Sequence, residues 1–212
     1  MSTNASHPRL QYDVEYPESL SRLLIFFKLW LLAIPHYIVL AILGLAAGVV
    51  TIIAWFAILF TAKYPEGMWN FVLGVLRWGA RVQAYVMLQR DEYPPFSFEG
   101  DYPVHLDLEY PTHLNRWLVL IKWLLIIPHY IVLYVLQIVA EVITVIAWFA
   151  ILITGRYPRG MFDFIVGYQR WNARVSAYMF LLTDDYPPFS FEQGSTYTPG
   201  PSTGPSSAVS YR

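Results

Sequence analysis

Cysteine is absent from the chain, and its absence excludes disulfide bonds, thiolate metal sites and cysteine nucleophiles. Charge is scarce as well. Asp, Glu, Lys and Arg make up 14% of the 212 residues, whereas a soluble domain carries about 25%. The net charge is −1, and no run of Lys or Arg indicates a nucleic-acid partner.

The missing charge is concentrated in two long apolar segments. Residues 29–62 contain no charged side chain, and residues 123–155 contain one, Glu141. Both segments exceed the roughly 20 residues that cross a bilayer. We therefore predict an integral membrane protein, in which the first segment is too long for a cleavable signal peptide and serves as a retained anchor.

Catalytic and cofactor-binding motifs are also missing. The sequence has no CxxCH, HExxH, P-loop or GxSxG pattern. The acidic pairs Asp91-Glu92 and Asp184-Asp185 flank polar turns, where a catalytic carboxylate pair would lack the burial that it needs. We predict a protein without enzymatic activity, metal or cofactor.

What the chain does contain is an internal duplication. The heptapeptide YPPFSFE occurs at Tyr93–Glu99 and again at Tyr186–Glu192. Shifting the sequence by 94 and then 93 residues also aligns two IPHYIVL segments, two IAWFAIL segments and two RW..R..AY segments. We divide the chain into an N-terminal tail (1–9), a first unit (10–99), a second unit (100–192) and a disordered tail rich in Ser, Thr, Gly and Pro (193–212).

The order of these motifs, from IPH through WFAIL, RW..R..AY and YPPFS, resembles the bacterial membrane proteins grouped as domain of unknown function family 4389. The resemblance covers residues 14–192 in two copies. It implies a multi-span protein of the bacterial cytoplasmic (inner) membrane. It implies no activity.

Two arrangements fit the apolar segment of each unit. Residues 23–62 form either a hairpin of two membrane spans that turns near GLAAG (44–48), or one span over about 36–62 preceded by a surface segment. In the second unit the hairpin would turn at 136–141, so Glu141 would lie near water instead of at mid-membrane, where a lone carboxylate costs about 2.5–3.5 kcal/mol. We favour the hairpin, although Pro35 and Pro128 would then kink its first helix.

The third segment of each unit, 66–89 and 159–182, carries a stripe of glycine and arginine at helical spacing. We predict amphipathic helices that lie in the membrane interface, because a spanning helix would place Arg77 near its centre. The stripe also fits close helix packing inside a bundle. Lys28 and Lys122 would snorkel at the interface.

Short alternating segments, LQYDVEY (10–16) and VHLDLEY (104–110), predict β-strands on the cytoplasmic side. We expect 96–99 and 104–110 to form a β-hairpin, and 10–15 to pair near 189–192. The complete prediction is an all-α membrane protein of two tandem units, each a transmembrane helical hairpin with an interfacial helix, plus short strands.

The positions of Lys and Arg indicate how the two units are oriented in the membrane. Lys and Arg residues flank the same ends of both units, so the positive-inside rule favours an even number of spans per unit. We predict four spans as two parallel hairpins, related by an axis near the membrane normal, with both termini in the cytoplasm.

Few residues are candidates for function. Arg77, Arg81, Arg170 and Arg174 could bind lipid phosphates or a partner, or form structural ion pairs. His36 and His129 are the matched polar residues of the apolar segments; two such histidines could hold a haem iron, but a structural hydrogen bond is the more common role.

We predict an accessory or scaffold subunit that packs against lipid, other membrane subunits or copies of itself. The alternative is a small transporter or channel with its site where the two units meet.

Overall fold

The computed structural model describes residues 10–27 and 32–193. Within them the chain forms β1 (Gln11–Val14), α1 (Leu24–Phe27), α2 (Ile34–Thr61), α3 (Glu66–Val86), β2 (Val104–Asp107), α4 (Leu118–Leu125), α5 (Ile127–Thr154) and α6 (Arg159–Met179). One strand followed by three helices thus occurs twice, as the duplication predicts. The predicted tail 1–9, Lys28 and nearly all of the predicted disordered tail lie outside the described residues.

The long apolar segments do not turn at the predicted positions, so the predicted hairpins are wrong. α2 continues through Gly44–Gly48, and α5 continues through residues 136–141. Pro35 and Pro128 lie in the first turn of their helices, where a missing N–H costs nothing, and they begin the helices instead of kinking them. Ala62 and Gly155 end the helices in the left-handed conformation.

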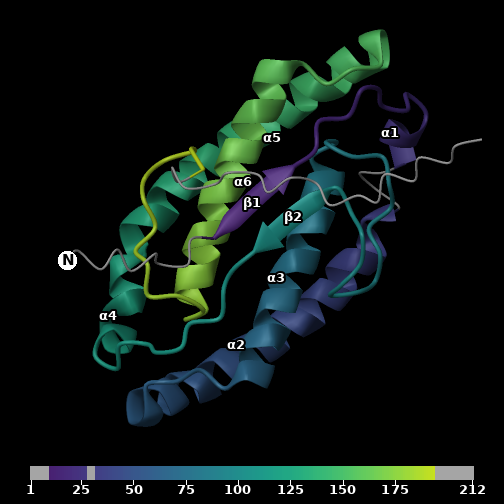
Figure 1. The fold of residues 1–212 in the computed structure, drawn as a ribbon. Helices are drawn as coiled ribbons and strands as arrows, with labels where there is room; N and C mark the ends of the chain where they lie inside the picture. The colour runs from purple at the N-terminus through teal and green to yellow at the C-terminus, as the bar shows by residue number, and fades with distance from the viewer. Residues whose placement is uncertain (1–9, 28–31, 194–212) are drawn as a thin grey trace, which may run out of the picture.

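Four helices lie side by side in one layer (Figure 1). α3 and α6 form the centre and contact each other, while α2 packs outside α3 and α5 packs outside α6. The two strands cross one face of this layer. The predicted interfacial helices, α3 and α6, are therefore the most enclosed elements of the fold, with 11 buried residues each.

The two units run antiparallel. Leu114 N donates to Ala62 O at 2.9 Å, which places the start of the second unit's helices beside the end of α2. Leu20 N donates to Gly155 O, also at 2.9 Å, which places the start of the first unit's helices beside the end of α5. The predicted parallel arrangement is thus wrong, and the pseudo-twofold axis passes through the layer between α3 and α6 (Figure 1).

β1 pairs with β2 in an antiparallel two-stranded ribbon, in which Tyr12 lies opposite Leu106. The alternation in the sequence is confirmed, because Tyr12, Val14, Val104 and Leu106 are buried while the residues between them are exposed. The predicted partners are wrong: 96–99 is not a strand, and 10–15 does not pair near 189–192.

Each strand lies on the helices of the other unit. β2 contacts α3, and β1 contacts α6. Two tyrosines also form hydrogen bonds between the units: Tyr16 OH donates to Tyr157 O, and Tyr110 OH donates to Tyr64 O. The two units are therefore intertwined, and each completes the core of the other.

The outer helices remain largely exposed. Two helical stretches, Ile34–Thr61 and Leu118–Thr154, are long and apolar enough to cross a membrane, and only 11% and 22% of their most apolar windows are buried. On α2 the four buried residues, His36, Ala47, Ala54 and Ile58, form one stripe against α3. The opposite side of α2 is apolar and exposed, at Leu45 to 74%.

Candidate functional site

The repeated heptapeptide closes an aromatic box around a buried histidine in each unit. Trp78 Nε1 donates to His36 Nδ1 at 3.2 Å, and the ring of Phe96 stacks on the imidazole with centroids 4.2 Å apart. The second unit repeats the box, with Trp171 donating to His129 at 3.1 Å and Phe189 stacking on it at 3.9 Å.

The two histidines occupy separate boxes, each built from the residues of its own unit. Nδ1 is an acceptor in both, so Nε2 carries the proton. The arrangement does not present the two imidazoles to one iron, and the bis-histidine haem alternative has no support in the geometry. The boxes explain why IPH, RW and YPPF recur together: each motif supplies one wall.

One glycine of the stripe in each unit, Gly74 or Gly167, packs closely against the same heptapeptide. A Cβ built on Gly74 would lie 2.8 Å from Phe98 Cγ, and one built on Gly167 would lie 2.7 Å from Phe191 Cβ. Both contacts involve atoms near the backbone of the phenylalanine, which cannot move away easily. At Gly74 and Gly167 the stripe therefore faces protein, as the bundle-packing alternative states, whereas Gly67 and Gly160 meet no atom within 4 Å.

We expect Gly74→Ala to destabilise the protein by about 1–3 kcal/mol, because overpacking must displace Phe98. Gly79→Ala on the same helix is the matched control: nothing lies within 4 Å of its added Cβ, and it should stabilise by about 0.5–1 kcal/mol, since alanine is the better helix former. Unfolding in neutral detergent measures both. Equal effects of the two substitutions would refute the packing role of Gly74.

Arg77 and Arg170 hold the exchanged strands. Arg77 Nε donates to Leu106 O at 2.9 Å and its guanidinium pairs with Asp107 at 2.8 Å. Arg170 Nε donates to Tyr12 O at 2.9 Å and lies 3.5 Å from an Asp13 oxygen. Each arginine thus finds its carboxylate on the strand of the other unit.

Arg81 and Arg174 hold the end of the heptapeptide. Arg81 donates to the carbonyl oxygens of Ser97, Glu99 and Gly100, and Arg174 donates to Ser190 O at 2.5 Å. These bonds take the place of a strand ladder, which is why the alternating FSFE forms no strand. Burial lowers the pKa of Arg174 to about 10, and the charge of Arg170 acts in the same direction; the group stays charged at neutral pH.

The contacts thus favour the structural alternative for all four arginines, and their binding of lipid phosphates stays a prediction. Lys122 is likewise enclosed instead of snorkelling: it is 1% exposed, donates to Thr183 O and pairs with Asp184 at 2.7 Å.

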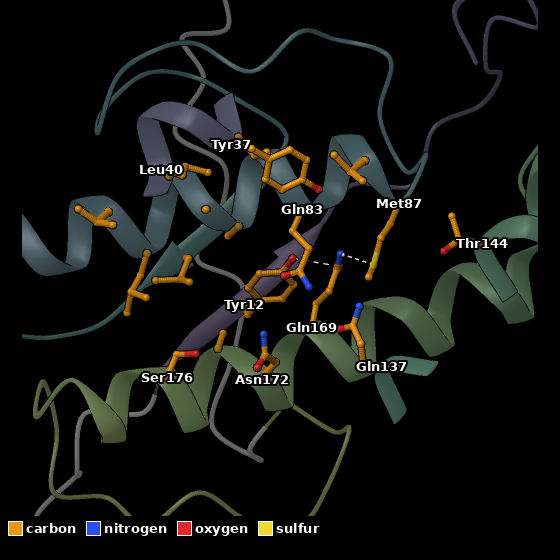
Figure 2. A pocket seen from close by; sticks show the side chains of 18 of the residues that line it. Tyr12, Tyr37, Leu40, Gln83, Met87, Gln137, Thr144, Gln169, Asn172 and Ser176 are labelled. Atoms are coloured by element: carbon orange, nitrogen blue, oxygen red, sulfur yellow. Dashed lines mark hydrogen bonds between the residues drawn. The ribbon is translucent and has the colours of Figure 1, made fainter. Parts of the chain in front are cut away.

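A groove of about 620 Å³ lies on the pseudo-twofold axis (Figure 2). Matched positions of α3 and α6 form its walls: Gly79 and Asn172, Ala80 and Ala173, Gln83 and Ser176. Tyr12 and Leu106 of the ribbon line the groove on the side where the ribbon lies.

The polar groups of the groove come from both units. Figure 2 shows Gln83 and Gln169 extending toward each other above Tyr12, and Gln137 reaching in from α5. Tyr12 OH donates to Gln169 Oε1 at 3.0 Å. Gln137 Nε2 donates to Glu141 Oε1 at 2.8 Å. Among the described residues that line the groove, Glu141 is the one that carries a charge.

The sequence prediction missed this groove, because it assigned Glu141 and Gln137 to a hairpin tip. One signal was present. The corresponding residues of the first unit are Gly48 and Gly44, so the two copies differ most in polarity at the helix face that lines the groove.

The sequence model of a protein family described as a domain of unknown function, DUF4389, matches residues 23–97 and 116–190. Together the two matches cover more than half of the chain. The chain belongs to the DUF4389 family. Each DUF4389 match ends within the heptapeptide, and β1 and β2 lie outside both matches. No curated protein and no solved structure shows significant similarity to the chain.

Proposed function

We propose that this DUF4389 protein is a non-enzymatic membrane protein that acts by binding, as an accessory or scaffold subunit of the bacterial cytoplasmic membrane. The observation that supports the proposal is the outer surface of α2 and α5. Large apolar side chains follow the exposed side of both helices, including Leu45, Ile52, Phe56, Ile131, Ile138 and Phe149. Apolar patches of this extent mark contact with lipid or with another protein.

The position of the ribbon argues for an orientation of the helix layer. Upright helices would place the ribbon at the middle of the bilayer, because Arg77, at the middle of α3, pairs with Asp107. Within the described residues the ribbon has two open edges, and open sheet edges do not occur in contact with hydrocarbon. Asp13 and Asp107, with exposed side chains, would add about 2.5–3.5 kcal/mol each at that depth.

A layer that lies in the plane of the membrane avoids these costs. Its ribbon face points to water, and its other face, with the outer sides of α2 and α5, points to lipid. The charged ends of both units, at Lys63 and Arg156, then lie in one compartment although the units are antiparallel. We assign that compartment, and both termini, to the cytoplasm. In this orientation the outer sides of α2 and α5 are free to contact other membrane subunits or a second copy.

The absence of cysteine makes the orientation testable. We expect Lys63→Cys and Arg156→Cys, which replace exposed residues at the ends of α2 and α5, to react with a membrane-impermeant maleimide only in inverted vesicles. Labelling of the two cysteines from opposite sides would contradict the in-plane orientation.

That opposite result would favour the second candidate, a small transporter or channel. The observation on its side is the groove on the pseudo-twofold axis, because transporters with inverted repeats bind their substrates where the repeats meet, at the middle of the membrane. Upright antiparallel units would have this arrangement.

A further inference from the structure

We propose that the groove on the pseudo-twofold axis binds one amphiphile with a primary ammonium head, the head at Glu141 and the hydrocarbon tail toward α2. The inference extends the proposed membrane role to a ligand class. Ligand binding is measured on the protein in detergent, without a membrane. A failure to bind the ligand is therefore distinguishable from a failure of the membrane proposal.

The charge of the groove selects the head group. Among the described residues no Lys, Arg or His lines the groove, and Glu141 has no ion-pair partner there. The remaining polar lining is neutral: the amides of Gln83, Gln137, Gln169 and Asn172, with hydroxyl groups. An anionic head would therefore meet a carboxylate and no counter-charge, whereas an ammonium would form a charge-assisted hydrogen bond.

Glu141 is positioned by its neighbours. Tyr168 OH donates to Gln137 Oε1, and Gln137 Nε2 donates to Glu141 Oε1 at 2.8 Å. Within the described residues Oε2 receives no hydrogen bond, so one oxygen is fixed and the other is open to a ligand. This relay exists in the second unit only, because Gly44 and Gly48 occupy the matching positions of α2.

The α2 side of the groove has room for a tail. Leu40 of α2 lines the groove, and a Cβ added to Gly44, one helical turn further along α2 and just beyond the lining, would meet no atom within 4 Å. Val75, Leu76 and Val86 of α3 and Leu40 of α2 supply apolar walls on that side. The groove is thus polar toward α5 and apolar toward α2, which fits an amphiphile, and its volume lies within the range of about 300–1,000 Å³ typical of ligand sites.

The test uses the full chain in a neutral detergent, with dodecylamine as the probe, dodecanol as the probe without charge and butylamine as the probe without a tail. Calorimetric titration should show dodecylamine binding about tenfold or more tightly than either control probe. Glu141→Gln should lose that advantage over dodecanol. Glu66→Gln, an exposed carboxylate of α3 outside the groove, should keep it and so controls for binding of the amine to detergent micelles.

A second variant tests the tail. Gly44→Leu fills space on the α2 side, and it should weaken dodecylamine binding while leaving butylamine binding unchanged. Thermal unfolding of each variant without ligand confirms that the fold is intact. Equal binding of dodecylamine by the wild-type chain and Glu141→Gln, or of dodecanol and dodecylamine by the wild-type chain, would overturn the proposal.

Discussion

A fragment of residues 1–103, which contains the first unit alone, is expected to form a homodimer and no stable monomer. In the full chain two parts of the second unit contact the helices of the first. β2 packs on α3, and Leu114 N donates to Ala62 O at the end of α2. The fragment lacks both. A monomer would expose the buried faces of α3 and leave Arg77 without its carboxylate and its backbone acceptor.

The geometry allows the fragment to pair with itself. The ribbon is centred on Tyr12 and Leu106, which are matching positions of the two units, and Gln11 lies opposite Asp107 just as Asp13 lies opposite His105. Two copies of β1 can therefore form the same antiparallel ladder about a true twofold axis. Arg77 of one copy would then reach Asp13 of the other, which is the residue that matches Asp107.

Light scattering coupled to gel filtration in detergent measures the state of the fragment. Gln11→Pro is the matched control. Glu15 N donates to Pro103 O, so in this register the hydrogen-bonded pairs alternate and include Gln11. Proline at Gln11 therefore removes a ladder hydrogen bond and should abolish the dimer. A well-folded monomer of residues 1–103 would show that the exchanged strands are not needed, and would contradict the intertwined arrangement.

The duplication, the helical character of the long apolar segments and the alternation in both strands could be predicted from the sequence, because each depends on local periodicity. The location of Gly74 and Arg77 on one helical face was predictable for the same reason. What that face contacts was not, since the strand and the heptapeptide that cover it come from distant parts of the chain.

The hairpin prediction failed for a physical reason. It was favoured to keep Glu141 away from hydrocarbon, on the assumption that each apolar segment crosses the membrane upright. In the structure Glu141 lies on an unbroken helix beside a groove formed by both units. No single-helix argument could anticipate a groove whose walls belong to two antiparallel copies. The strand partners were missed because exchange between units leaves no periodic signal.

Cysteine labelling in native membranes measures whether lipid covers the outer sides of α2 and α5. Leu45→Cys and Ile138→Cys place thiols at matched positions on the two outer sides, whereas Glu109→Cys places one just beyond β2, where the side chain is exposed. Hydrocarbon excludes the thiolate and the charged reagent alike, since burial of charge away from water is costly.

A charged maleimide added to inverted vesicles should modify Glu109→Cys readily. Leu45→Cys and Ile138→Cys should stay unmodified until the membrane is dissolved in a denaturing detergent. Labelling of Leu45→Cys and Ile138→Cys at the rate of Glu109→Cys in intact vesicles would show that lipid does not cover the outer sides of α2 and α5.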